Sequence, residues 1–136
     1  MAKTGQDVAK SMLKIEDETL WDSAMEMSET KLVVIDIHQD WCGCCDSIHP
    51  SISRVMMDTD ECDERFVYAS ASIGKVGAKI KAALPSDNQI DLEKNGCLPL
   101  FGVFKGKVCL MVVVGVDSPT LLQQIQQNMP DKPVKE

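Results

Sequence analysis

Leu32 to Ile37, with the sequence Leu-Val-Val-Ile-Asp-Ile, is the segment that most restricts what this chain can fold into. Branched apolar residues follow one another here instead of alternating with polar ones. A strand with one face in water alternates, whereas a strand covered on both faces is apolar almost throughout. The segment therefore predicts the central strand of an α/β domain, with helices on both sides of its sheet. Asp36 lies inside this strand, so we expect a buried carboxyl group.

The rest of the chain supplies the other elements of such a domain. Val8–Ile15 fits either a first strand or a short helix, and Lys105-Gly106-Lys107 predicts a hairpin. Pro50 predicts a kink in its helix, and the breaker Pro85-Ser86-Asp87-Asn88 predicts a loop or insertion. Apolar periodicity and capping residues predict strands at Phe66–Ile73, Leu98–Phe104 and Val108–Val116, and helices at Glu16–Met27, Ser47–Met57, Val76–Leu84 and Ser118–Asn128. We expect a mixed sheet of four to five strands flanked by helices.

Length and charge narrow the class of protein. The 136 residues suit one domain, which we place at 16–129, after an N-terminal extension or first element at 1–15 and before a flexible tail at 130–136. A net charge of −7 offers no basic surface for phosphates or anionic lipids, so we expect neither nucleic acid nor membrane as a partner. The polar N-terminus and the lack of a long apolar run favour a cytoplasmic protein. Its six cysteines are then expected to be reduced, catalytic or metal-binding.

Three of the cysteines form the cluster Trp41-Cys42-Gly43-Cys44-Cys45, between a predicted strand and a predicted helix. Cys42 would lie at the helix N-terminus, where free amides and the helix dipole stabilise a thiolate. Cys42 is therefore the expected nucleophile of thiol–disulfide exchange, and Cys45 the thiol that resolves the mixed disulfide. A zinc site usually needs a second pair of ligands, so redox chemistry is favoured over metal binding.

This sequence resembles the thioredoxin family from about Glu16 onward. The cysteine motif is similar to the Trp-Cys-Gly-Pro-Cys of that family, and further landmarks are in register at Asp36, Pro50, Pro99 and Gly115. The resemblance implies that Asp36 shuttles the proton of Cys45, in keeping with a buried acid whose charged form is disfavoured. It also implies a cis peptide bond before Pro99 that exposes the Leu98 backbone to an extended substrate, with Trp41 as a cover beside the site. No cofactor is implied.

Several residues depart from the family pattern. Cys44 occupies the usual proline position, and Cys97 is expected to face the site, so both are candidate regulatory thiols. Asp46 and Ser70 replace lysines, and Ser70 would be the neighbour of the buried acid. Both changes remove positive charge that would stabilise a thiolate, which predicts weaker reductase activity than in a general thioredoxin. Cys62 and Cys109 are interpreted as structural.

Within the family, the segment Ile35 to Gly43 and the acidic balance look most like the thioredoxin-like light chains of outer-arm axonemal dynein. That resemblance implies protein disulfide substrates, docking on a dynein heavy chain and other dynein subunits, and a place in the axoneme of a cilium or flagellum. The alternatives are a non-catalytic docking module and a general cytosolic thioredoxin. Metal binding by Cys42, Cys44 and Cys45 would need a fourth ligand from elsewhere.

Overall fold

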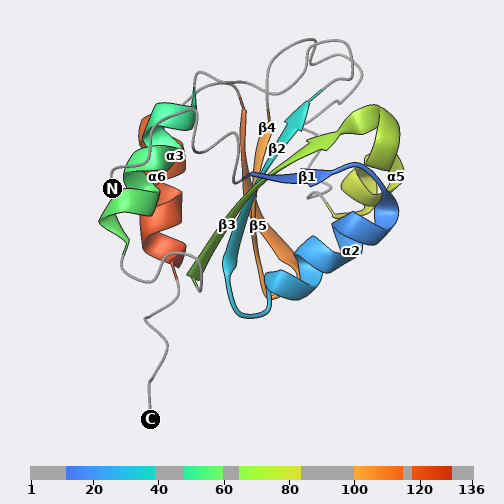
Figure 1. Cartoon of the computed structure of the whole chain (residues 1–136), viewed down its shortest axis with the longest axis horizontal. Helices are drawn as coiled ribbons and strands as arrows, with labels where there is room; N and C mark the ends of the chain where they lie inside the picture. Colours follow the sequence, from blue (N-terminus) through green and yellow to red (C-terminus); the bar gives the residue numbers. More distant parts are fainter. Residues whose placement is uncertain (1–11, 39–47, 60–64, 84–99, 115–117, 130–136) are drawn as a thin grey trace.

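A computed structural model of the chain describes residues 12–38, 48–59, 65–83, 100–114 and 118–129 (Figure 1). Strands and helices alternate along most of it, as the sequence predicts. The elements are β1 (Leu13–Ile15), α2 (Glu18–Met27), β2 (Leu32–His38), α3 (His49–Asp58), β3 (Phe66–Ser72), α5 (Ile73–Ala83), β4 (Leu100–Lys105), β5 (Val108–Val114) and α6 (Ser118–Asn128).

The strands form one 5-stranded sheet in the order β1-β3-β2-β4-β5. Strands β1 and β2 both run parallel to β3, while β4 is antiparallel to β2 and β5 is antiparallel to β4. This arrangement confirms the predicted mixed sheet, and it places β2 at the centre.

Helices cover both faces of the sheet, with α3 and α6 on one side and α2 and α5 on the other (Figure 1). The side chains of β2 alternate between the two layers: Val34 belongs to the core beneath α3 and α6, and Val33 and Ile35 belong to the core beneath α2 and α5. All three are 0% exposed. The prediction of a central strand covered on both faces is therefore confirmed.

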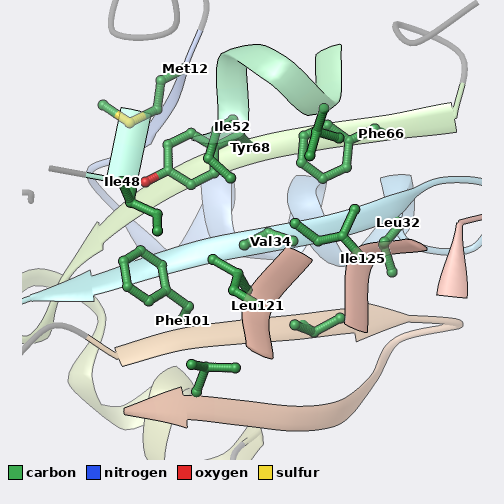
Figure 2. Close-up of a cluster of buried hydrophobic side chains, with 13 residues drawn as sticks. Met12, Leu32, Val34, Ile48, Ile52, Phe66, Tyr68, Phe101, Leu121 and Ile125 are labelled. Atoms are coloured by element: carbon green, nitrogen blue, oxygen red, sulfur yellow. The ribbon is translucent and has the colours of Figure 1, made fainter. Parts of the chain in front are cut away.

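Tyr68 and Phe101 are large buried side chains of the core beneath α3 and α6, to which α3 adds Ile52 and α6 adds Leu121 and Ile125 (Figure 2). In the core beneath α2 and α5, Trp21 of α2 contacts Phe104 of β4 edge-on, with ring centroids 5.7 Å apart. Trp21 is 2% exposed and therefore belongs to the core.

The predicted hairpin joins β4 and β5. Gly106 and Lys107 have φ angles of 62° and 66°, a conformation that the two-residue turns of twisted hairpins require. The turn is held by the C-cap residue of α2, because the Gly106 and Lys107 amides donate to the Ser28 carbonyl and to its Oγ at 2.6 and 2.9 Å. The end of α2 therefore fixes where β4 and β5 begin to pair.

The two helix starts predicted at Ser47 and Val76 have different outcomes. Ser47 lies outside the described ranges, so that start stays a prediction; α3 spans His49–Asp58, with Ile48 as its N-cap and Pro50 in its first turn. A proline in the first turn breaks no intrahelical hydrogen bond, so no kink is expected within the described helix. The other helix, α5, begins at Ile73, directly after β3, and its backbone is non-helical at Val76, where the sequence had placed its start.

Gly102 of β4 should tolerate no side chain. An added Cβ would lie 2.6 Å from Cε1 of Phe104, a ring that is 0% exposed and already packed on Trp21. Gly102→Ala is therefore expected to lower the free energy of unfolding by about 1–3 kcal/mol, measured by urea unfolding. Gly77→Ala in α5 is the matched control, because its Cβ would meet only Ile73 at 3.8 Å. This change should raise stability by up to about 1 kcal/mol; a Gly102→Ala protein as stable as the wild type would contradict the packing described.

Candidate functional site

Asp36 is the predicted site residue that the structure describes. It lies in β2 and is 0% exposed, so the expected buried acid is confirmed. Its partners in the neighbouring strands are Ser70 of β3 and Phe101 of β4. Since paired residues of neighbouring strands point to the same face, Asp36 shares the layer beneath α3 and α6 with the apolar core. Complete burial of a carboxyl group penalises its charged form.

A row of polar residues leads from Asp36 to the edge of the sheet. Ser70 pairs with Asp36 on one side and with Lys14 of β1 on the other, so the three residues lie side by side on consecutive strands. Ser70 is 8% exposed, whereas Lys14 is exposed to solvent. The expectation that Ser70 would neighbour the acid is confirmed. The nearest positively charged side chain along this row is that of Lys14, one strand further from Asp36.

The segments that carry the other predicted residues connect to the same end of the sheet. Residues 39–47 follow His38, the last residue of β2, and residues 84–99 precede Leu100, the first residue of β4. Ile37 and Leu100 are direct partners in the antiparallel pairing. The first segment therefore begins at the end of β2, and the second ends at the start of the adjacent strand β4.

The remaining predicted site residues lie outside the described part of the chain. They are Trp41, Cys42, Cys44, Cys45, Cys97, Leu98 and Pro99. Their roles stay predictions.

A cavity of about 160 Å³ opens beside Ser70 at the carboxyl ends of β1, β2 and β3. Its polar lining comes from Lys14, Glu16, His38, Ser70, Ser72 and Lys75. Sequence reasoning missed this group because it depends on the register between strands far apart along the chain, and no local pattern reports that register. The structure places the half-buried side chain of His38 against this cavity.

His49 is a buried residue of the core. The side chain at the start of α3 is 3% exposed, and its ring meets the Tyr68 ring edge-on, with centroids 5.8 Å apart. The contact joins the first turn of α3 to the middle of β3, on the face of the sheet that holds Asp36.

Cys109 is half-buried in β5, against the core beneath α2 and α5. Its Sγ lies 3.4 Å from the Met111 carbonyl oxygen, to which it donates. Burial raises the pKa of the Cys109 thiol to about 11, although hydrogen bonds with the Met111 and Val103 backbone oppose this shift. These features confirm the interpretation of Cys109 as structural, whereas Cys62 lies outside the described ranges.

Within the described ranges, no cluster of three histidine, cysteine or acidic side chains is placed to hold a metal ion. The helices described there are also too short or too polar to cross a membrane.

Comparison with known proteins points to one family. A family model described as Thioredoxin matches residues 11–127. Thioredoxin-T of Drosophila melanogaster is 29% identical over 108 residues, which are 79% of this chain and 60% of that protein. The thioredoxin domain-containing protein 3 homolog of Ciona intestinalis is 24% identical over 95% of this chain, which spans 17% of that protein. The thioredoxin of Ictalurus punctatus is 26% identical over 86% of this chain and 98% of its own length.

Solved structures share the fold. Thioredoxin f2 of Chlamydomonas reinhardtii superposes with a TM-score of 0.60 at 21% identity, covering 89% of this chain and 99% of that one. Thioredoxin NaTrxh of Nicotiana alata gives a TM-score of 0.60 at 17% identity, over 88% and 94%. The mixed sheet with helices on both faces is therefore a thioredoxin fold.

Cys109 should be almost inert toward alkylating reagents in the folded protein. With a pKa of about 11 instead of 9.0, its thiolate fraction at pH 8 falls by roughly a hundredfold. Iodoacetamide labelling, mapped by mass spectrometry, should therefore be slower by at least that factor than in urea. The raised pKa also means that this thiol's contribution to stability is complete below pH 9.0 and is lost as the pH rises toward 11. Equal labelling rates in the two states would contradict this account.

Proposed function

Because the chain belongs to the thioredoxin family, we propose that it exchanges its own dithiol with disulfides of other proteins. The observation that carries this proposal is Asp36, a fully buried carboxyl in the central strand, six residues before Cys42 in the sequence. An acid in such a place costs stability, and perturbed acids of this kind gather at sites of proton transfer. Its strand leads directly into the segment that carries the cysteine cluster.

The proposed reaction has two steps. The Cys42 thiolate attacks one sulfur of a substrate disulfide, forms a mixed disulfide, and releases the other substrate sulfur as a thiolate that takes up a proton. Cys45 then loses its proton and attacks the Cys42 sulfur, which releases the second substrate thiol and leaves a Cys42–Cys45 disulfide. Two electrons pass to the substrate, and an external dithiol reductant restores the starting state.

Asp36 would accept the Cys45 proton in the second step. A carboxyl whose charged form is penalised by burial binds a proton more readily than one in water, so it suits a transfer from a thiol near neutral pH. Ser70, its direct neighbour on β3, is a hydroxyl and brings no positive charge to oppose that uptake.

Leu98 and Pro99 are proposed to bind the substrate, with Trp41 covering the site. The pairing of Leu100 with Ile37 supports this assignment, because it brings the chain that follows Pro99 next to the strand that precedes Trp41. An extended substrate could then pair with the Leu98 backbone while its disulfide faces Cys42. Cys44 and Cys97 are proposed as regulatory thiols of the same site.

A narrower proposal concerns the place of this chemistry in the cell. We propose that the chain is a light chain of outer-arm axonemal dynein, docked on a heavy chain in a cilium or flagellum. This proposal is based on the sequence likeness of the segment Ile35 to Gly43. A general cytosolic thioredoxin is an equally good alternative, and the Ictalurus punctatus thioredoxin, matched over 98% of its length, favours it. Co-purification of the tagged chain with dynein heavy chains from extracted axonemes separates the two, because a free thioredoxin would stay in the unbound fraction.

Disulfide reduction by the recombinant chain tests the proposed function. Insulin reduction with a dithiol as electron source should be lost in Cys42→Ser, by a factor of at least about 10² since the nucleophile is gone. Cys109→Ser is the matched control, because this thiol is half-buried in β5 and its pKa is raised to about 11. Cys44→Ser should keep activity and show by its rate whether Cys44 competes with Cys45. Full activity in Cys42→Ser would overturn the proposal, and an inactive wild type would favour a non-catalytic docking module.

A further inference from the structure

The cavity beside Ser70 is built from four elements. Lys14 comes from β1, His38 from β2, Ser70 and Ser72 from β3, and Lys75 from α5. His38 and Ser72 are direct partners in the β2–β3 pairing, as Lys14 and Ser70 are in the β1–β3 pairing. The sheet thus fixes donor groups from three strands around one space.

One polar group at this cavity, the hydroxyl of Ser72, lacks a hydrogen-bond partner among the described residues. The residue is 9% exposed, and within the described part of the chain its Oγ has no hydrogen-bond partner. A buried hydroxyl without a partner lowers stability, and such groups in native proteins usually have a water, ion or ligand as their partner. The hydroxyl of Ser72 can therefore donate to a group bound in this cavity.

Among the described residues that line the cavity, positive charges outnumber negative ones, in a chain whose net charge is −7. Lys14 and Lys75 both line it, while Glu16 is the one acid among its described lining residues. The ion pairs formed among the described residues use other lysines: Lys79 pairs with Asp22 and Lys107 with Glu29, each at 3.1 Å. The ammonium groups of Lys14 and Lys75 thus have no carboxylate partner among the described residues.

We propose that this cavity binds a phosphate group, either as free phosphate or as a phosphate monoester. Lysine ammonium groups act as point charges and are common ligands of phosphate in proteins. The two serine hydroxyls add donors for further oxygens. A volume of about 160 Å³ is roughly ten times what a single water needs, so four phosphate oxygens fit. The proposal involves no cysteine and stands apart from the proposed redox function.

Titration of the reduced protein with inorganic phosphate, followed by ¹H–¹⁵N NMR at constant ionic strength set with chloride, tests this site. Saturable shifts are expected at the Ser70, Ser72 and Lys75 amides, with a dissociation constant on the order of 1 mM. Lys14→Gln and Lys75→Gln should each weaken binding by about fivefold or more, and Ser72→Ala should also weaken it. Lys79→Gln is the matched control, because Lys79 lies on the same helix but pairs with Asp22.

A parallel titration with phosphoserine separates the two sources of phosphate. Saturable shifts with both compounds support a site for phosphate monoesters, and shifts with inorganic phosphate alone support a site for the free ion. The proposal is overturned if neither compound gives saturable shifts. It is also overturned if Lys14→Gln and Lys75→Gln, with dispersed spectra that show they are folded, bind phosphate as well as Lys79→Gln does.

Discussion

The burial of β2 on both faces is the constraint on which the rest of this structure depends. A strand at the centre of the sheet has both faces covered, so most of its side chains are apolar. Val34 packs in one core, and Val33 and Ile35 pack in the other. The same burial applies to Asp36, which is 0% exposed. The position of this buried carboxyl, which lowers stability, is therefore set by the strand at the centre of the packing.

This constraint connects the fold with the proposed chemistry. Asp36 is held by two neighbouring strands, with Ser70 on one side and Phe101 on the other, so the strand register fixes the position of its backbone. Two residues further along, β2 ends at His38 and the chain enters the segment of the cysteine cluster. A buried acid in the strand that leads into the cysteine cluster fits the proposal that the protein tolerates a local cost in stability for a functional group.

Much of the fold could be predicted from local patterns, whereas most of the cavity could not. The apolar run around Ile35 predicts a central strand, and Gly106 predicts a hairpin turn, because each of these patterns is typical of one structure. The start of α5 at Ile73 was missed because β3 passes into the helix without a separating breaker. The row from Lys14 through Ser70 to Asp36 depends on strand register, which periodicity alone does not fix. The cysteine roles came from spacing and family resemblance, and they lie outside the described residues.

The rate of disulfide reduction by Asp36→Asn, measured across pH, tests most directly whether the buried acid serves the thiol pair. Asparagine keeps the shape of the side chain but cannot carry the proton. The account predicts a fall in rate on the order of 10²-fold near pH 7, in a protein whose free energy of unfolding is not lowered, since the amide has no charge to desolvate. A variant with the wild-type rate and an unchanged pH dependence would contradict it.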